Sequence, residues 1–98
     1  MALTHALYTP GELAQQIADN AKTLRLAQDL SRKSLAERSG VPESSIKRFE
    51  STGQISLGSL VLLASVLGVA HQLPGLFRVE QPATLDELKR GSRVRGRR

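Results

Sequence analysis

The chain has 98 residues, which is enough for one domain with one modest core. It contains no cysteine, so disulfide bonds and thiolate metal sites are excluded. No apolar run approaches the roughly 20 residues that a membrane-spanning helix needs. The first residues, MALTHALYTPGEL, lack the basic start and apolar middle of a secretory signal. We therefore expect a small cytoplasmic protein that has no membrane partner.

The net charge of +5 is distributed unevenly along the chain. Residues 1–88 carry eight basic and nine acidic side chains, and within them residues 22–48 carry seven basic and three acidic ones. A local basic patch and a basic tail favour a nucleic-acid or other acidic partner, although a basic tail can also be only a solubilising end. The tail holds six basic residues: Lys89, Arg90, Arg93, Arg95, Arg97 and Arg98.

The first predicted helix runs from about residue 10 to residue 28. Thr9 can cap it, Pro10 suits its first position, and Glu12 completes a capping box. Asp29 should end the helix in a left-handed conformation. Helical spacing places an apolar stripe on this helix, formed by Leu13, Ile17, Ala21 and Leu24, with Ala14 and Ala18 beside it.

The stretch LSRKSLAERSGVPESSIKRFE predicts two short helices joined by a turn. Ser31 can cap the first helix, roughly 32–39, and Pro42 opens the second, roughly 42–51. Gly40 supplies a turn conformation that a side chain would oppose. The apolar members, which can share one small core, are Leu35, Ala36, Val41, Ile46 and Phe49.

A fourth helix should begin after Ser56, which can cap it, and end at Gly68. It is apolar on two sides, which is typical of a central helix in a bundle. Its second side includes Leu62 and Val66, which are a candidate dimer surface but are expected rather to lie in the core. Residues 70–77 then predict a short fifth helix or turn.

These elements together predict an all-α fold, a compact domain of five helices over residues 10–77. Residues 1–9 form an N-terminal segment before it. Residues 78–98 form a basic C-terminal tail, in which a second capping box favours a short helix over 84–90.

The segment of residues 21–77 resembles the Cro and phage-repressor type of helix-turn-helix domain, the XRE-like family, which has a lambda-repressor-like fold. Leu24, the LSRKSLAERSGVPESSIKRFE block and the following ISLGSLVLLASVLGV carry the resemblance. The sequence departs from the family at three positions. Arg32 stands where Gln is frequent, Ser39 where an apolar residue is usual, and Pro42 where a capping Ser or Thr is usual. These departures leave the fold intact but make the operator sequence unpredictable.

The resemblance implies that the second helix of the motif enters the major groove of duplex DNA. Its base-reading residues would be Glu43, Ser44 and Lys47, because a carboxylate can accept from a cytosine amine and an ammonium can donate to guanine. The residues implied for contact with the DNA backbone are Arg32, Lys33, Ser34, Ser45, Arg48 and Thr52.

A narrower resemblance connects the chain to HipB-like antitoxin regulators. It rests on RFESTGQISLGSLVLLASVLG, the Leu-Pro-Gly-Leu-Phe segment, TLDELKRG and the Arg-rich end. Such proteins bind their own operator as dimers and also bind a HipA-like kinase toxin, so the implied partners are operator DNA, a second copy and such a toxin. The candidate dimer or partner surface is Leu73, Leu76 and Phe77, although Leu76 and Phe77 could equally close the monomer's own core.

No pattern predicts catalysis, a metal site or a cofactor, since His5 and His71 are the only histidines and no glycine-rich phosphate loop is present. Three alternatives remain: a module that mainly binds the toxin, a stand-alone phage-type repressor, and an RNA-associated basic protein. RNA readers usually offer aromatic stacking platforms. Tyr8, Phe49 and Phe77 are the only aromatics, and we expect the latter two to be buried, which argues against RNA.

Overall fold

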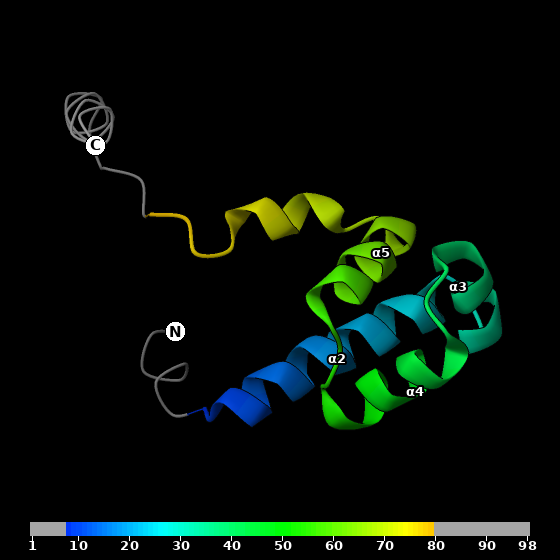
Figure 1. Cartoon of the computed structure of the whole chain (residues 1–98), viewed down its shortest axis with the longest axis horizontal. Coiled ribbons are helices and arrows are strands. Elements are labelled where there is room, and N and C mark those ends of the chain that lie inside the picture. Colours follow the sequence, from blue (N-terminus) through cyan, green and yellow to red (C-terminus); the bar gives the residue numbers. More distant parts are fainter. Residues whose placement is uncertain (1–7, 80–98) are drawn as a thin grey trace.

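The computed structural model describes residues 8–79. Within this range the chain forms four α-helices and one 3-10 helix, and no strand (Figure 1). The elements are α2 (Pro10–Ala27), α3 (Arg32–Ser39), α4 (Glu43–Thr52), α5 (Leu57–Leu67) and η1 (Ala70–Gly75). The predicted all-α fold is confirmed. The predicted helix over 84–90 and the six basic residues of the tail lie outside the described residues.

The helices surround one core to which every α-helix contributes. α4 packs against α2 and α3, α3 also packs against α5, and η1 packs on α5 (Figure 1). α4 and α5 meet at 97°, so the arrangement is orthogonal. The buried cluster consists of Ala18, Leu30, Leu35, Val41, Ile46, Phe49, Leu63 and Leu67.

Most helix ends follow the local signals in the sequence. The Thr9 hydroxyl accepts from the Glu12 amide at 3.1 Å, and the Glu12 carboxylate accepts from the Thr9 amide at 2.9 Å, which completes the predicted capping box. The hydrogen bond from the Thr9 amide to the carboxylate also lowers the pKa of Glu12. Asp29 has φ 56°, so it ends α2 in the predicted left-handed conformation. Ser31 caps α3 and Ser56 caps α5, also as predicted.

The turn between α3 and α4 explains one departure from the family pattern. Gly40 ends α3 with φ 78°, the conformation for which the sequence predicts glycine. Ser39, directly before it, is buried, but its hydroxyl accepts a hydrogen bond from the Val41 amide at 3.1 Å. A polar residue is therefore tolerated at this core position because its hydroxyl is hydrogen-bonded to a backbone amide of the turn.

The predicted apolar stripe of α2 is partly wrong. Leu13 and Ile17 are exposed, whereas Ala18, expected only beside the stripe, is completely buried. α2 and α4 approach closely where a Cβ on Gly53 would lie 3.0 Å from the backbone of Ala14. Small residues at this crossing allow the close approach, and the larger side chains of α2 lie beside it.

Two further expectations about burial are wrong. Leu62 is 47% exposed because it lies on the outer side of α5, whereas Val66 is half-buried against the core. Phe77 is wholly exposed, because the chain leaves the packed domain after η1 and turns there with φ 61°. The argument against RNA that relied on its burial therefore fails for Phe77.

Within residues 8–79, no single helix is long and apolar enough to cross a membrane. α4 and α5 would be long and apolar enough only if they were taken together, and a bend of 97° separates them.

Candidate nucleic-acid interface

α4 has one buried side and one exposed side. Its buried residues are Ile46, Phe49 and Glu50. The predicted base readers Glu43, Ser44 and Lys47 are all exposed, as is Arg48, while Ser45 is half-buried. Ser51 and Thr52, at the end of α4, are exposed as well. We call Glu43, Ser44, Lys47 and Arg48 the exposed side of α4. Their side chains present donors and acceptors to solvent rather than packing into the domain.

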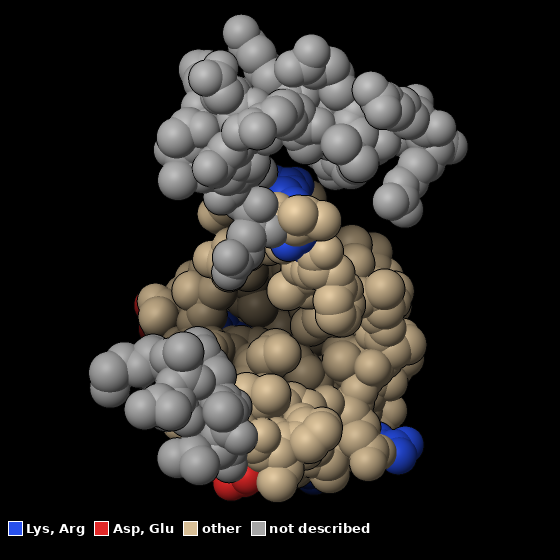
Figure 2. All heavy atoms as spheres, turned by 90° about the vertical axis from the view of Figure 1, so that its left-hand side faces the viewer, with Lys and Arg blue, Asp and Glu red and all other residues tan. Residues whose placement is uncertain are grey.

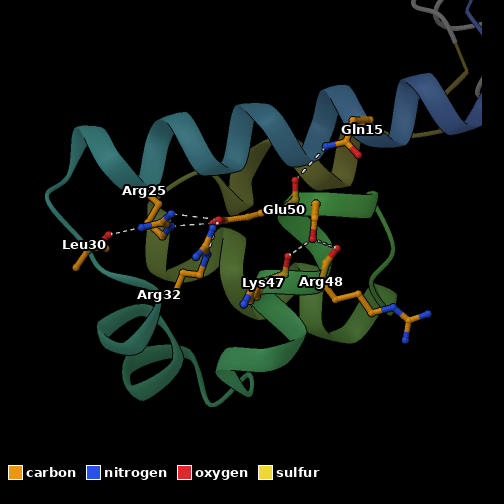
Figure 3. Close-up of polar contacts among 8 residues, drawn as sticks. Gln15, Arg25, Leu30, Arg32, Lys47, Arg48 and Glu50 are labelled. Carbon is orange, nitrogen blue, oxygen red and sulfur yellow. Dashed lines mark hydrogen bonds and ion pairs between the residues drawn. The ribbon is translucent and has the colours of Figure 1, made fainter.

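A buried carboxylate fixes the orientation of α4. Arg25 donates from Nε to Glu50 Oε2 at 2.7 Å and from Nη2 to Oε1 at 3.1 Å (Figure 3). A third donor of Arg25, Nη1, reaches the Leu30 carbonyl at 2.8 Å. The Glu50 carbonyl also accepts from Gln15 Nε2 at 3.0 Å. α4 is thus tied to α2 at two points beneath its exposed side.

Arg25 and Glu50 are only 5% and 7% exposed, and among the described residues no buried side-chain polar atom lacks a hydrogen-bond partner. Burial alone would raise the pKa of Glu50. Hydrogen bonds from Arg25 and Arg32, with the attraction of both guanidinium groups, outweigh burial and lower that pKa. Glu50 is therefore an ionised carboxylate held between two cations.

Sequence reasoning did not identify this ion pair. The available signal was that Arg25 stands four and seven residues after Ala21 and Ala18, and that Glu50 stands four residues after Ile46, so each shares a helix face with core residues. Opposite charges on two inward-facing helix sides suggest a buried pair, because a lone buried charge is very unfavourable.

Arg32, predicted to contact the DNA backbone, shares the same carboxylate. Its Nε donates to Glu50 Oε1 at 2.8 Å, and its side chain is 35% exposed (Figure 3). Within residues 8–79 its two terminal amino groups have no hydrogen-bond partner. One edge of the guanidinium is thus anchored in the domain, and the other can meet an anion at the start of α3.

The other predicted backbone-contact residues of α3 are placed differently from one another. Lys33 is exposed. Ser34 is half-buried and belongs to the cap of α3, since its amide donates to the Ser31 hydroxyl at 3.0 Å and the two hydroxyls lie 3.1 Å apart. Part of the hydrogen-bonding capacity of Ser34 is therefore used within the protein.

The end of α4 forms a second polar region. Arg48 donates from Nη2 to the Gln54 side chain at 2.6 Å, and the Thr52 hydroxyl donates to the Arg48 carbonyl at 2.7 Å. Arg48 projects away from the Glu50 cluster (Figure 3). A hollow of about 340 Å³ lies beside it, lined by Ser45, Arg48, Gln54, Ile55, Ser56 and Ser59. Gln54, Ser56 and Ser59 were not predicted as site residues, and the bend of the chain from α4 into α5 places them beside Arg48.

The predicted dimer or partner residues lie on a different part of the molecule. Leu73 is half-buried, whereas Leu76 and Phe77 are exposed after η1.

Within the described range, no three His, Asp or Glu side chains come together as metal ligands would.

Comparison with known families agrees with this geometry. A helix-turn-helix family model matches residues 22–73, more than half of the chain and the whole of α3, α4 and α5. The chain belongs to the Cro and phage-repressor type of helix-turn-helix family. It is a DNA-binding transcription regulator of the XRE-like type. No curated protein and no solved structure gives a significant match.

In this helix-turn-helix regulator, α3 and α4 are the two helices of the motif and Gly40 lies in the turn between them. Family geometry places the second helix in the major groove. The exposed side of α4, which includes Arg48, is therefore the candidate interface, together with Arg32 at the start of α3.

Proposed function

We propose that this regulator represses its own operon by binding an inverted-repeat operator as a homodimer. The observation that chiefly supports the proposal is the exposed side of α4. It carries hydrogen-bonding side chains near the start of a helix whose orientation is fixed from beneath by Glu50. A helix held in a fixed orientation, with solvent-exposed polar groups on its outer side, is what base reading in a major groove requires.

The roles on DNA follow from position and chemistry. Glu43, Ser44 and Lys47 would read base edges, and each good contact is worth about 1–3 kcal/mol of discrimination. Arg32 and Arg48 would hold phosphates, together with Lys33, Ser34, Ser45 and Thr52. The hydroxyl of Thr52 already donates to the Arg48 carbonyl, so the main role of Thr52 would be to hold the end of α4 in position.

The dimeric state is supported by the small size of the reading surface. One such motif reads only a few base pairs, and two copies on half-sites one helical turn apart supply useful affinity. Two-fold symmetry of the protein would then match the inverted repeat of the operator.

The more specific proposal is a HipB-like antitoxin that also binds a HipA-like kinase toxin. It is supported by the sequence resemblance that extends through the Leu-Pro-Gly-Leu-Phe segment to the Arg-rich end. A stand-alone repressor would lack this partner but would bind DNA in the same way.

A protection footprint on the protein's own promoter tests the repressor proposal. We expect two protected half-sites related by inversion, with centres about 10–10.5 base pairs or a multiple apart. Inserting about five base pairs between them should place the half-sites on opposite sides of the duplex and abolish dimer binding. Protection without an inverted repeat, or binding indifferent to the insertion, would contradict the proposal.

Removing residues 89–98 separates the two roles of the basic tail. If the tail serves DNA, affinity for the operator falls. If it serves the toxin, a HipA-like kinase encoded beside the regulator no longer co-purifies with it while operator binding stays. Failure of the full-length protein to bind any neighbouring kinase would leave the stand-alone repressor.

A further inference from the structure

An apolar groove of about 620 Å³ lies between α2, α5 and η1. Its walls include Ile17 and Leu24 from α2, Leu60 and Leu67 from α5, and Leu73 and Leu76 from η1 and the residue after it. Figure 2 shows a hollow on this side of the molecule, surrounded mainly by residues other than Lys, Arg, Asp and Glu. Ile17 and Leu76 are 52% and 59% exposed, so the groove has open, water-contacting apolar edges.

An apolar projection stands directly beside this groove. Leu76, Phe77 and Val79 are all exposed, and Phe77 is exposed completely. Phe77 also has φ 61°, a left-handed conformation that is rare for a bulky residue. Such a conformation persists where contacts stabilise it, and residues 8–79 leave the Phe77 ring wholly exposed.

We infer that a second copy of this chain fills the groove, with Phe77 of each subunit inserted into the groove of the other. The groove and the projection belong to one continuous patch at η1, and a two-fold interface places such a patch against itself. One reciprocal contact then covers both grooves and both aromatic rings. A different protein would have to supply a separate complement for each feature. This inference deepens the proposed homodimer and rests on it.

The exposed side of α4 stays open in this arrangement. From α4, the groove takes only Phe49, which is buried on the inner side of the helix. None of the residues proposed to contact DNA lines the groove. Dimer formation and operator binding can therefore occur together.

Matched truncations of exposed apolar residues test the interface in the full-length protein. Phe77→Ala should raise the dimer dissociation constant, measured by analytical ultracentrifugation, by about 100–10,000-fold, since two large apolar side chains, one from each subunit, are lost from the interface. Leu57→Ala is the control, because Leu57 is 69% exposed on α5 but does not line the groove. It should leave the constant unchanged. Helical far-UV circular-dichroism spectra matching that of the natural protein would show that both variants fold.

Cross-linking tests the reciprocal geometry, since the natural chain has no cysteine. An equimolar mixture of Ile17→Cys and Phe77→Cys single variants, at concentrations above the weakened dissociation constant, should form a disulfide-linked heterodimer. A mixture of Leu57→Cys and Phe77→Cys should not. A protein that stays monomeric at millimolar concentration, a dimer indifferent to Phe77→Ala, or equal cross-linking through Leu57 would overturn the inference.

The two proposals fail separately. If operator DNA is not bound but Phe77→Ala dissociates the dimer, the repressor proposal is lost and the interface stands. If the operator is bound by a dimer that Phe77→Ala does not weaken, the interface is lost and the repressor proposal stands.

Discussion

Glu50 is the residue on which the position of the candidate interface depends most directly. Its carboxylate lies on α4 and accepts hydrogen bonds from Arg25 on α2 and Arg32 at the start of α3. A single side chain therefore connects three helices and both halves of the helix-turn-helix. Breaking such a buried pair from one side is costly because the remaining charges lose their partner.

We expect Glu50→Gln to lower the free energy of unfolding at neutral pH by about 3–5 kcal/mol, the range for disrupting a buried ion pair. The natural protein should also lose stability in acid. Its Glu50 pKa is lowered from the ordinary value of 4.5. Ionised Glu50 therefore stabilises the fold above pH 4.5, and this contribution is lost as the pH falls through the lower folded-state pKa.

Urea unfolding monitored by circular dichroism at pH 7 and at about pH 3 measures both effects. Glu50→Gln should show the smaller loss between the two pH values. Glu43→Gln is the matched control, because Glu43 is an exposed carboxylate on the same helix and should change stability by no more than about 0.5 kcal/mol. Equal effects of the two substitutions would refute the role of Glu50.

Lys47 and Arg32 should respond differently when each is replaced by alanine. Lys47→Ala should relax sequence preference at one position in each half-site by about 1–3 kcal/mol, because it removes a base contact. Arg32→Ala should weaken binding to all sequences alike, because it removes a phosphate contact. Binding to operators with single base changes distinguishes the two patterns, and Arg38→Ala, an exposed arginine of α3 outside the proposed site, is the control.

At the scale of elements, the ends of the helices are encoded locally, but their closest approach is not. Gly40 and Gly53 both have φ close to 78°, so each ends its helix in the same left-handed conformation. A Cβ on Gly40 would meet open space, whereas one on Gly53 would lie 3.0 Å from the backbone of both Ala14 and Gln15. Of these two glycines, only Gly53 combines a left-handed conformation with a close approach to α2.

Gly40→Ala and Gly53→Ala therefore form a matched pair. Gly40→Ala should lower the free energy of unfolding by about 1–2 kcal/mol, the cost of a left-handed conformation for a residue with a Cβ. Gly53→Ala should cost more, since α2 and α4 must also separate. Urea unfolding at equal protein concentration compares them. A larger loss of unfolding free energy for Gly40→Ala would mean that the close approach of α2 and α4 does not add to the cost of a side chain at residue 53.

At the scale of the whole molecule, the salt dependence of operator affinity should show how many subunits bind. Each phosphate contact contributes about 0.9 to the slope of log affinity against log salt. Arg32→Ala should therefore reduce the slope by about 0.9 for a monomer and about 1.8 for a two-fold dimer. Fluorescence anisotropy titrations of a labelled operator over a series of salt concentrations measure this slope. A reduction near zero would mean that Arg32 does not contact phosphate.

The sequence alone was sufficient for the fold class, the helix boundaries and the helix-turn-helix motif. These depend on local chemistry. Thr9, Ser31 and Ser56 cap the starts of helices, and Gly40 and Gly68 end helices in a left-handed backbone conformation that glycine adopts readily. The polar residues of the exposed side of α4 could be found for the same reason, since helical periodicity separates them from Ile46 and Phe49.

Only the tertiary structure decided which inward-facing charges pair and which apolar residues remain uncovered. The partner of Arg25 lies 25 residues away in Glu50, and no local pattern fixes a contact between separate helices. Ile17 and Phe77 look like core residues by type, but burial depends on what packs opposite each side chain. α2 meets the end of α4 at Ala14 and Gly53, so the larger α2 residues Ile17 and Leu24 are left along a groove.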